Sequence, residues 1–582
     1  MEETALFTAM AILIVLASFS AIVLGKLKLP SIIGFLVTGI VVVNYIGTTE
    51  EISMVVDIFS DLGLVMLLFI IGLEIDISKL RTQGKFAILI ALIQIPVMLF
   101  TGMIVGSYMG YNTVQSVTFG AILSGASTAV VLAVLKSNNV LDHGKMDILV
   151  LVMIIEDISQ VIMISLLTPM MKGETLSTDS TLVLFISIAV FMIVCSTLGL
   201  RIVPKVIDWF YAHSNGELIS LLCIGLLFVV SLIANMVGLS VAIGAFLTGL
   251  MVSLSKPKHV VEEFVNPMKT LFMGMFFISV GAKVSVDSLM ANLPMVLAIY
   301  VLFAVAMFLA VNTGYWVAGG DPRSGWISAL SMCTMGEFAF IISKQAFDYG
   351  VFDQAFYSSI IGAAIVSMLI LPLLVRTSER TYGLVYRMCP NPVKRGFGAV
   401  SKERDLVYHG LSVVSYKTKD RFANALTNAA FLFLLVIAIE VVFFFAYTPL
   451  SIWLSANFGN TEEWWRIAIL FANVLALLEP CRRLSKFFQF IIYLRERGEA
   501  HLRSDYMNEV ESPFAYRYLS TLAVGAAVDV LIVIIVPNGI DNLMHVIVLL
   551  AVLIVVLIYQ YFAYRKKLFP STTKDIEGKS QK

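Results

Sequence analysis

Long apolar segments separated by short polar connections recur along the first 376 residues of this 582-residue chain. Each segment has about the length of a helix that crosses a bilayer, which needs roughly 20 mostly apolar residues. The pattern predicts thirteen membrane-spanning helices, at 4–24, 30–47, 55–73, 85–109, 116–135, 146–168, 181–201, 217–234, 238–254, 265–283, 290–316, 325–347 and 354–376. Beyond a polar break it predicts four more, at 421–447, 464–493, 515–536 and 543–563.

The connections between these segments alternate in charge. Basic residues such as Lys26, Arg81 and Lys136 fall on one side of the predicted membrane, and the opposite connections carry few, among them Lys172 and Lys344. Because basic residues concentrate in cytoplasmic loops, we expect the N-terminus outside and the C-terminus in the cytoplasm. The most suitable location is a prokaryotic plasma membrane.

The same pattern divides the chain into parts. Residues 1–376 form a first transmembrane domain, and 377–420, rich in both charge signs, form a cytoplasmic connector. Residues 421–567 are predicted to be a separate four-helix membrane domain, and 568–582 a polar cytoplasmic tail. Nothing in the sequence assigns a role to the last four helices.

Composition narrows the function classes. The chain is 59% hydrophobic and 14% charged, which is typical of membrane proteins, and its zero net charge does not suggest binding to nucleic acid. Its five cysteines lack metal-ligand spacing. With no metal cluster, nucleophile constellation or phosphate-binding loop, the sequence predicts a protein that is not an enzyme and needs no cofactor. The lipid bilayer is its expected surrounding.

An acidic doublet stands at the centre of the segment 146–168. Glu156 and Asp157 have no basic residue within one helical turn. A charged side chain at the middle of a membrane helix costs a few kcal/mol, so such residues by default indicate a functional site. One interpretation is a protonated pair hydrogen-bonded between helices. The preferred one is a carboxylate site that exchanges protons with a bound cation.

Two other segments contain small and polar residues at the same depth. The segment 116–135 holds Ser124, Ser127 and Thr128 near two glycines, and 325–347 holds Glu337 next to a glycine. Either cluster alone fits ordinary close packing of helices. The two segments are the fifth and the twelfth predicted spans. Because seven, an odd number, separates them, they cross the membrane in opposite directions, as inverted repeats require. We therefore expect two interrupted helices whose half-helix ends face an ion site in mid-membrane.

Seven stretches, in this order, resemble the cation:proton antiporter superfamily, in particular its Kef-like and NapA-like branch. They are LPSIIGFLVTGI (29–40), DLGLVMLLFIIGLEIDISKLR (61–81), LSGASTAVVLAVL (123–135), IIEDIS (154–159), GLSVAIGAFLTGLMVS (238–253), LFMGMFFISVGAKV (271–284) and MGEFAFIIS (335–343). The resemblance implies an all-α polytopic membrane protein with a thirteen-span inverted-repeat antiporter fold and broken crossing helices. The four C-terminal transmembrane helices are additional. It also implies a homodimer whose mobile core moves against a dimerisation domain.

The resemblance also assigns site residues. Asp157 matches the ion-binding aspartate of the family, and Ser127 and Thr128 match small polar residues close to the ion. Glu337 matches the glutamate of the second crossing helix. Glu156 stands where relatives carry Asp, Asn or Gln. The predicted cation ligands are Asp157, Glu156 and Thr128.

The chain departs from the family in two places. Electrogenic relatives carry a lysine in the eleventh span, where this sequence offers Asn312 as the strongly polar residue. Lys283, at the outer end of the tenth span, is expected to reach the interface more readily than the site. Together with Ser124 and Glu337, these residues are weaker candidates. A soluble nucleotide-binding gate, as in Kef-type proteins, is not seen, so nucleotide or glutathione gating does not carry over.

The sequence therefore predicts a secondary transporter that exchanges a monovalent cation, Na+ first and K+ second, for protons by alternating access. The alternatives are a gated K+ efflux system and a non-transporting membrane sensor or regulator. The acidic doublet slightly favours electrogenic exchange. The missing lysine favours a protonated Glu156 and therefore electroneutral exchange, in which each cycle moves no net charge.

Overall fold

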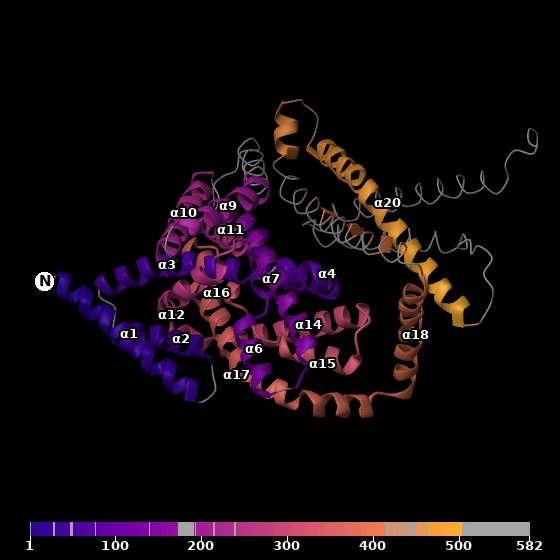
Figure 1. Cartoon of the computed structure of the whole chain (residues 1–582), viewed down its shortest axis with the longest axis horizontal. Coiled ribbons are helices and arrows are strands. Elements are labelled where there is room, and N and C mark those ends of the chain that lie inside the picture. The colour runs from indigo at the N-terminus through magenta and orange to yellow at the C-terminus, as the bar shows by residue number, and fades with distance from the viewer. Residues whose placement is uncertain are drawn as a thin grey trace, which may run out of the picture. The chain divides into compact units, whose positions relative to one another are not determined.

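The computed structural model has helical secondary structure (Figure 1). It describes residues 2–26, 30–46, 50–75, 77–138, 140–172, 191, 194–213, 216–237, 240–414, 450–457, 459, 462–502 and scattered positions between 418 and 443. The predicted spans at 515–536 and 543–563, the tail, and most of 181–201 and 421–447 lie outside the described residues. The chain divides into two compact units, Met1–Cys389 and Pro390–Lys582, and each is considered by itself.

The helices of the first unit follow the predicted spans. They are α1 (Glu2–Lys26), α2 (Ser31–Val41) with a π-helical continuation (Val42–Ile46), α3 (Glu50–Glu74), α4 (Ile77–Tyr108), α5 (Thr113–Leu123), α6 (Thr128–Asn138), α7 (His143–Met171), α9 (Leu200–His213), α10 (Gly216–Met236), α11 (Val241–Ser253), α12 (Lys258–Ala282), α13 (Val286–Ala291), α14 (Leu293–Val317), α15 (Pro322–Ser331), α16 (Glu337–Asp348) and α17 (Gln354–Met388). Within the described residues, six helical segments are long and apolar enough to cross a membrane, and four shorter helices are apolar. The protein is an integral membrane protein.

Two predicted spans end too early. Helix α17 continues to Met388, twelve residues beyond the predicted end at 376, and α9 continues to His213, beyond the predicted end at 201. The extension in α9 is amphipathic, because Pro204 and Ile207 are buried while its basic residues are exposed. The extension of α17 is mostly exposed. A hydropathy pattern finds the membrane-embedded length of a helix but not a polar continuation that stays helical.

Packing contacts occur in matched pairs between the two halves of the first unit. Helix α2 packs on α12 while α11 packs on α3, and α4 packs on α5 while α14 packs on α15. In the same way α4 packs on α7 and α14 on α17. Corresponding helices stand seven predicted spans apart along the chain: α11 corresponds to α2, α12 to α3, α14 to α4 and α17 to α7. Two structural repeats produce this arrangement.

Glycines at equivalent places let the paired helices approach closely. A Cβ on Gly39 of α2 would lie 2.0 Å from the backbone oxygen of Ile278 in α12. A Cβ on Gly249 of α11 would lie 2.0 Å from the backbone oxygen of Phe69 in α3. No side chain fits at such distances, so glycine sets the spacing of these helices, as small residues do in membrane interfaces.

We expect Gly249→Ala to lower the thermal stability of the protein, because the added methyl group meets a backbone atom that has no freedom to rotate away. Overpacking of this kind costs about 1–3 kcal/mol. The measurement is thermal unfolding of the purified protein in detergent. Gly225→Ala is the control, because a Cβ there meets nothing within 4 Å and alanine favours helix. Equal unfolding temperatures for the two variants would contradict the packing argument.

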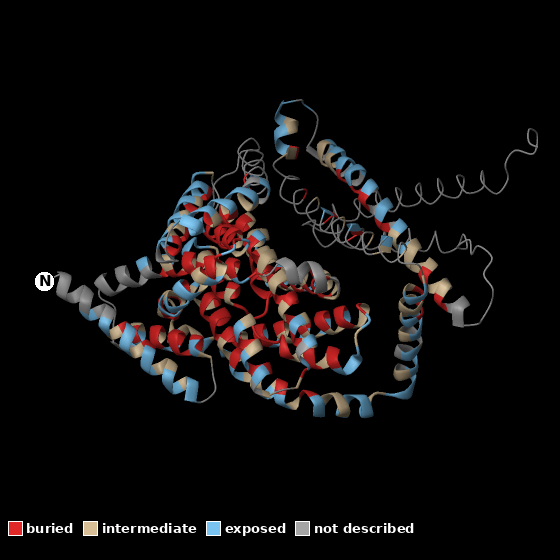
Figure 2. Ribbon diagram, in the orientation of Figure 1, coloured by how far each residue is buried: buried red, intermediate tan, exposed pale blue. Residues whose placement is uncertain are grey.

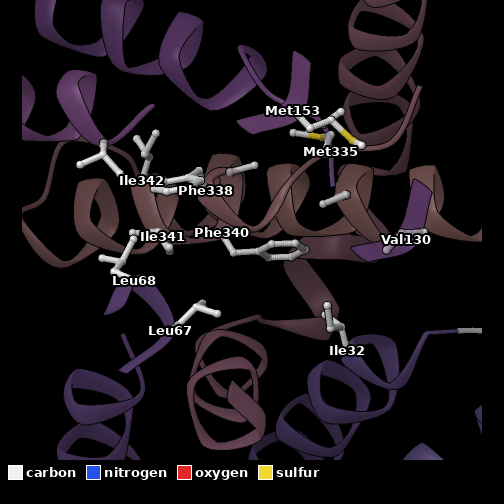
Figure 3. Close-up of a cluster of buried hydrophobic side chains, with 14 of the residues drawn as sticks. Ile32, Leu67, Leu68, Val130, Met153, Met335, Phe338, Phe340, Ile341 and Ile342 are labelled. Atoms are coloured by element: carbon white, nitrogen blue, oxygen red, sulfur yellow. The ribbon is translucent and has the colours of Figure 1, made fainter. Parts of the chain in front are cut away.

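The buried core of the first unit surrounds α16 (Figure 2). Figure 3 shows Phe340 of α16 above Leu67 of α3 and Ile32 of α2, with Met335 next to Met153 of α7 on the other side; all five are buried. Apolar side chains from helices far apart in the sequence therefore enclose the segment that carries Glu337.

In the second unit, α18 (Asn391–Val413) and α20 (Glu462–Leu502) pack together. A Cβ on Gly410 of α18 would lie 1.8 Å from the backbone oxygen of Leu494 in α20, so this contact also requires glycine. Arg495 of α20 forms an ion pair with Glu403 of α18 at 2.6 Å. The connector predicted over 377–420 is thus helical over most of its length. The division into four domains remains a prediction.

Candidate functional site

Two interrupted helices meet through their backbones. The first interruption separates α5 from α6, and the second separates α15 from α16, as the small and polar residues predict. The backbone N–H of Ser127 donates to the Thr334 carbonyl at 3.2 Å, and the N–H of Gly336 donates to the Gly125 carbonyl at 3.1 Å. Ala126 and Met335 form an antiparallel bridge between them. Four half-helix ends therefore converge on one short extended pair. We call this pair, residues 124–127 and 332–336, the crossing.

Glycine leaves room for the two chains to approach each other closely at this crossing. A Cβ on Gly336 would lie 2.8 Å from the carbonyl oxygen of Ala126, and one on Gly125 would lie 2.2 Å from Oε1 of Gln160. A side chain at either position would push the two strands apart or displace Gln160. Unwinding leaves backbone groups without helical partners, and inside a membrane these need protein partners or a ligand.

Glu156 of α7 holds the first interruption. Its Oε2 accepts a hydrogen bond from the backbone N–H of Ala126 at 2.9 Å, and the side chain is completely buried. Its Oε1 has no hydrogen-bond partner among the described residues. One oxygen of this acid therefore anchors the unwound chain, and the other remains unsatisfied in a dry environment.

Two glutamines also hold the first interruption, and sequence reasoning missed both. Gln160 donates from Nε2 to the Ala121 carbonyl at 3.4 Å, and Gln94 of α4 donates to the Ser124 carbonyl at 3.2 Å. Both residues are buried. Gln160 follows Glu156 by one helical turn and so shares its face of the helix, which is a signal the sequence contained. Gln94 lies far away in sequence, and only the fold shows its role.

Asp157 faces a different environment from its neighbour. It is half-buried, as are Thr128 at the start of α6 and Glu337 at the start of α16. The Thr128 hydroxyl has no hydrogen-bond partner among the described residues. Asp157 is therefore less completely covered by protein than Glu156.

Glu337 lies at the N-terminus of the half-helix α16. Its Oε1 accepts a hydrogen bond from the hydroxyl of Ser127 at 3.1 Å, which joins the second interruption to the first. An acid in the first turn of a helix is stabilised by the partial positive charge of the helix N-terminus. None of the ion pairs found among the described residues involves Glu156, Asp157 or Glu337.

The other three weaker candidates, Ser124, Asn312 and Lys283, lie in different places. Ser124 belongs to the first interruption, where it is buried and donates from Oγ to the Ala121 carbonyl at 2.8 Å. Asn312 of α14 lies beside Gly325 near the start of α15, about 10 Å along the helix from the second interruption. Lys283 caps the end of α12 and pairs with Asp348 at the far end of α16. The structure therefore brings Ser124 into the crossing but neither Asn312 nor Lys283.

Comparison with protein families supports a transport role for this arrangement. The model of the sodium/hydrogen exchanger transmembrane family matches residues 13–377, which include every residue of the crossing. The chain belongs to this family. Membership in the sodium/hydrogen exchanger family makes the protein a cation/proton antiporter by family, and a transporter rather than an enzyme.

The curated relatives of this chain are distant. K(+) efflux antiporter 6 of Arabidopsis thaliana is 28% identical over 386 residues, which are 64% of this chain and 63% of that protein. The Na(+)/H(+) antiporter of Enterococcus hirae is 25% identical over 373 residues, 63% of this chain and 96% of the relative. Among solved structures, the sodium proton antiporter MjNhaP1 from Methanocaldococcus jannaschii is 18% identical with a TM-score of 0.49, and the match covers 66% of this chain and 98% of that one.

Proposed function

We propose that this protein exchanges a monovalent cation for protons at Asp157, with Na+ as the first candidate and K+ as the second. The observation that carries the proposal is the crossing itself: a half-buried carboxylate stands beside two interrupted helices that are hydrogen-bonded to each other. Interrupted helices with this placement build the mid-membrane sites of many secondary transporters.

The groups around Asp157 suit a small hard cation. Such ions prefer oxygen ligands, and Asp157 supplies a carboxylate while Thr128 supplies a hydroxyl without a hydrogen-bond partner. Glu337 adds a second carboxyl group from the first turn of the opposite half-helix. Burial favours the neutral form of a carboxylic acid, so a proton and a cation compete for one position. Competition at a single alternately exposed site yields exchange without a continuous pore.

The names of the relatives leave the transported cation open. One relative is named for K+ efflux and another for Na+/H+ exchange, and a third, GerN of Bacillus cereus, is named as a Na+/H+-K+ antiporter. The site offers oxygen ligands without a rigid cage, which suits more than one monovalent ion. We propose Na+ first because the family model describes sodium/hydrogen exchange. Assembly as a homodimer, and an N-terminus outside with a cytoplasmic C-terminus, remain part of the proposal.

Proteoliposomes loaded with a pH-sensitive dye test the proposal. Addition of Na+, K+ or Li+ in turn to acid-loaded vesicles is expected to alkalinise the lumen, with a rate that saturates as the cation concentration rises. Empty liposomes are the control. A flux that does not saturate would support a channel-like K+ efflux system, and the absence of proton movement with every cation would support a sensor or regulator.

A further inference from the structure

A buried serine of α17 holds the second interruption. The Oγ of Ser367 accepts a hydrogen bond from the backbone N–H of Met335 at 3.0 Å, and it lies 3.4 Å from Oγ1 of Thr334. The side chains of Ser367 and Thr334 are completely buried within the protein. Because 32 positions separate Ser367 from Met335, the sequence around the second interruption does not indicate this contact.

The hydroxyl of Ser367 has all its hydrogen-bonding positions occupied. Its single proton is donated to the carbonyl of Ala364, within α17, at 2.6 Å. A hydroxyl that donates in this way keeps two lone pairs, which accept from the N–H of Met335 and from the hydroxyl of Thr334. Ser367 is therefore an acceptor toward the crossing, and it satisfies an N–H that the unwound chain leaves without a helical partner.

This serine has a counterpart in the first half of the unit. Ala126 and Met335 face each other in the antiparallel bridge, and their neighbours form the two hydrogen bonds of that bridge. A pair of this kind directs its own N–H groups away from the opposite strand. The N–H of Ala126 meets Oε2 of Glu156 in α7 at 2.9 Å, whereas that of Met335 meets Ser367 in α17. The corresponding helices of the two repeats thus supply both acceptors, a carboxyl group in one and a hydroxyl in the other.

The contact is connected to the proposed cation site by short hydrogen-bonded steps. The carbonyl of Thr334, whose side chain contacts Ser367, accepts from the N–H of Ser127 at 3.2 Å. The hydroxyl of Ser127 donates to Oε1 of Glu337 at 3.1 Å, and Thr128 is the next residue along the chain. A displacement of the second interruption therefore changes the positions of oxygen atoms on both half-helices.

We propose that Ser367 is a positioning residue for the exchange site. It holds the second interruption in place, so that Glu337 stays within hydrogen-bonding distance of Ser127. The inference rests on the proposed exchange at Asp157. The serine does not bind the cation itself, because both lone pairs of its hydroxyl already accept hydrogen bonds. It acts on the cation only through the residues of the crossing.

Ser367→Ala is expected to raise the half-saturating cation concentration of exchange about three- to tenfold, because the N–H of Met335 loses its acceptor. The saturating rate per incorporated protein should stay within about twofold. Ser367→Thr, which keeps a hydroxyl, should restore the wild-type half-saturation. The measurement is a cation titration in proteoliposomes. A Ser367→Ala variant with less folded protein but unchanged half-saturation would have lost only a structural contact, and would overturn the proposal.

Ser359→Ala is the matched control. Ser359 is equally buried and lies about 12 Å from Ser367 along α17, and its hydroxyl donates to the Ala355 carbonyl of its own helix at 2.7 Å. We expect wild-type half-saturation in this variant, and a shift equal to that of Ser367→Ala would contradict the positioning role. No exchange by the wild type in the same vesicles contradicts the proposed function itself. Wild-type exchange with unchanged half-saturation in Ser367→Ala contradicts only the role of the serine.

A double-mutant cycle tests whether Ser367 acts through the crossing. Ser127→Ala removes the hydroxyl that donates to Glu337. If the serine positions the site through this bond, Ser367→Ala should change half-saturation less than twofold in the Ser127→Ala background. Independent sites instead multiply their effects, and a fully multiplied shift would overturn the proposal.

If Ser367→Ala does not purify as a monodisperse protein, Ser367→Cys takes its place in both experiments. The thiol has a similar shape to the hydroxyl but is a weaker acceptor. The positioning role predicts a raised half-saturating concentration in this variant as well. A wild-type value there would show that the hydrogen bond to Met335 does not affect the site, and would overturn the proposal.

Discussion

Asp157→Asn is expected to abolish cation/proton exchange, reducing it to the background of empty liposomes. The amide of asparagine neither binds and releases a proton at physiological pH nor offers a charged ligand. Asp157 is half-buried, whereas Glu156, the other acid of the doublet, is completely buried and already accepts a hydrogen bond from the backbone. Competition between proton and cation then has no place to occur.

The same variant should fold at least as well as the wild type, since a neutral amide is less costly to bury among acids than a carboxylate. An unchanged or higher unfolding temperature together with lost exchange separates a transport role from a structural one. Asp147→Asn is the matched control, because Asp147 lies on the same helix, is exposed, and precedes Asp157 by about 15 Å. Near wild-type exchange by Asp157→Asn would show that the site is elsewhere.

The position of the crossing could be predicted because its chemistry is local. Clusters of glycine, serine and threonine at 120–128 and at 334–337 predict interruptions, and the structure breaks the two helices at 124–127 and 332–336. An unwound turn needs small residues and polar partners, and both are visible in the sequence. The family resemblance then assigned Asp157, Thr128 and Glu337, all three of which are half-buried in the structure.

The partners that hold the crossing together could not be predicted, because they come from distant segments. Gln94 reaches the Ser124 carbonyl from α4, and the Ser127 hydroxyl donates to Glu337 of α16. Such pairs depend on helix rotation and depth, and hydropathy reports neither. Glycines such as Gly249 show the same limit: the sequence contains them, but only the packing identifies the backbone atom that each one approaches.

The acidic doublet also separates in a way that its spacing only partly indicates. Consecutive helical residues point about 100° apart, so Glu156 and Asp157 were not expected to share one environment. In the structure Glu156 faces the buried backbone of the first interruption, whereas Asp157 is only half-buried. The two adjacent acids thus lie in different environments: Glu156 holds the unwound chain, and Asp157 is the acid that we propose binds the cation.

Glu156→Ala is expected to lose most of the exchange and to unfold at a lower temperature, whereas Glu156→Gln should retain both. Alanine leaves the N–H of Ala126 without its acceptor at 2.9 Å, and an unsatisfied buried donor costs about 1–3 kcal/mol. Glutamine keeps an oxygen in that place. Retention by Glu156→Gln would show that the negative charge of Glu156 is dispensable.

We expect the transport cycle to be electroneutral. Glu156 is completely buried, has no ion-pair partner among the described residues, and has one oxygen without a hydrogen bond. The neutral acid is the less costly form in such a place. The burial of Glu156 thus favours an electroneutral cycle, whereas the acidic doublet in the sequence slightly favours an electrogenic one. With potassium and valinomycin setting the membrane potential, the equilibrium Na+ gradient of the wild type should not depend on voltage. A voltage-dependent gradient that disappears in Glu156→Gln would instead make Glu156 a second proton carrier.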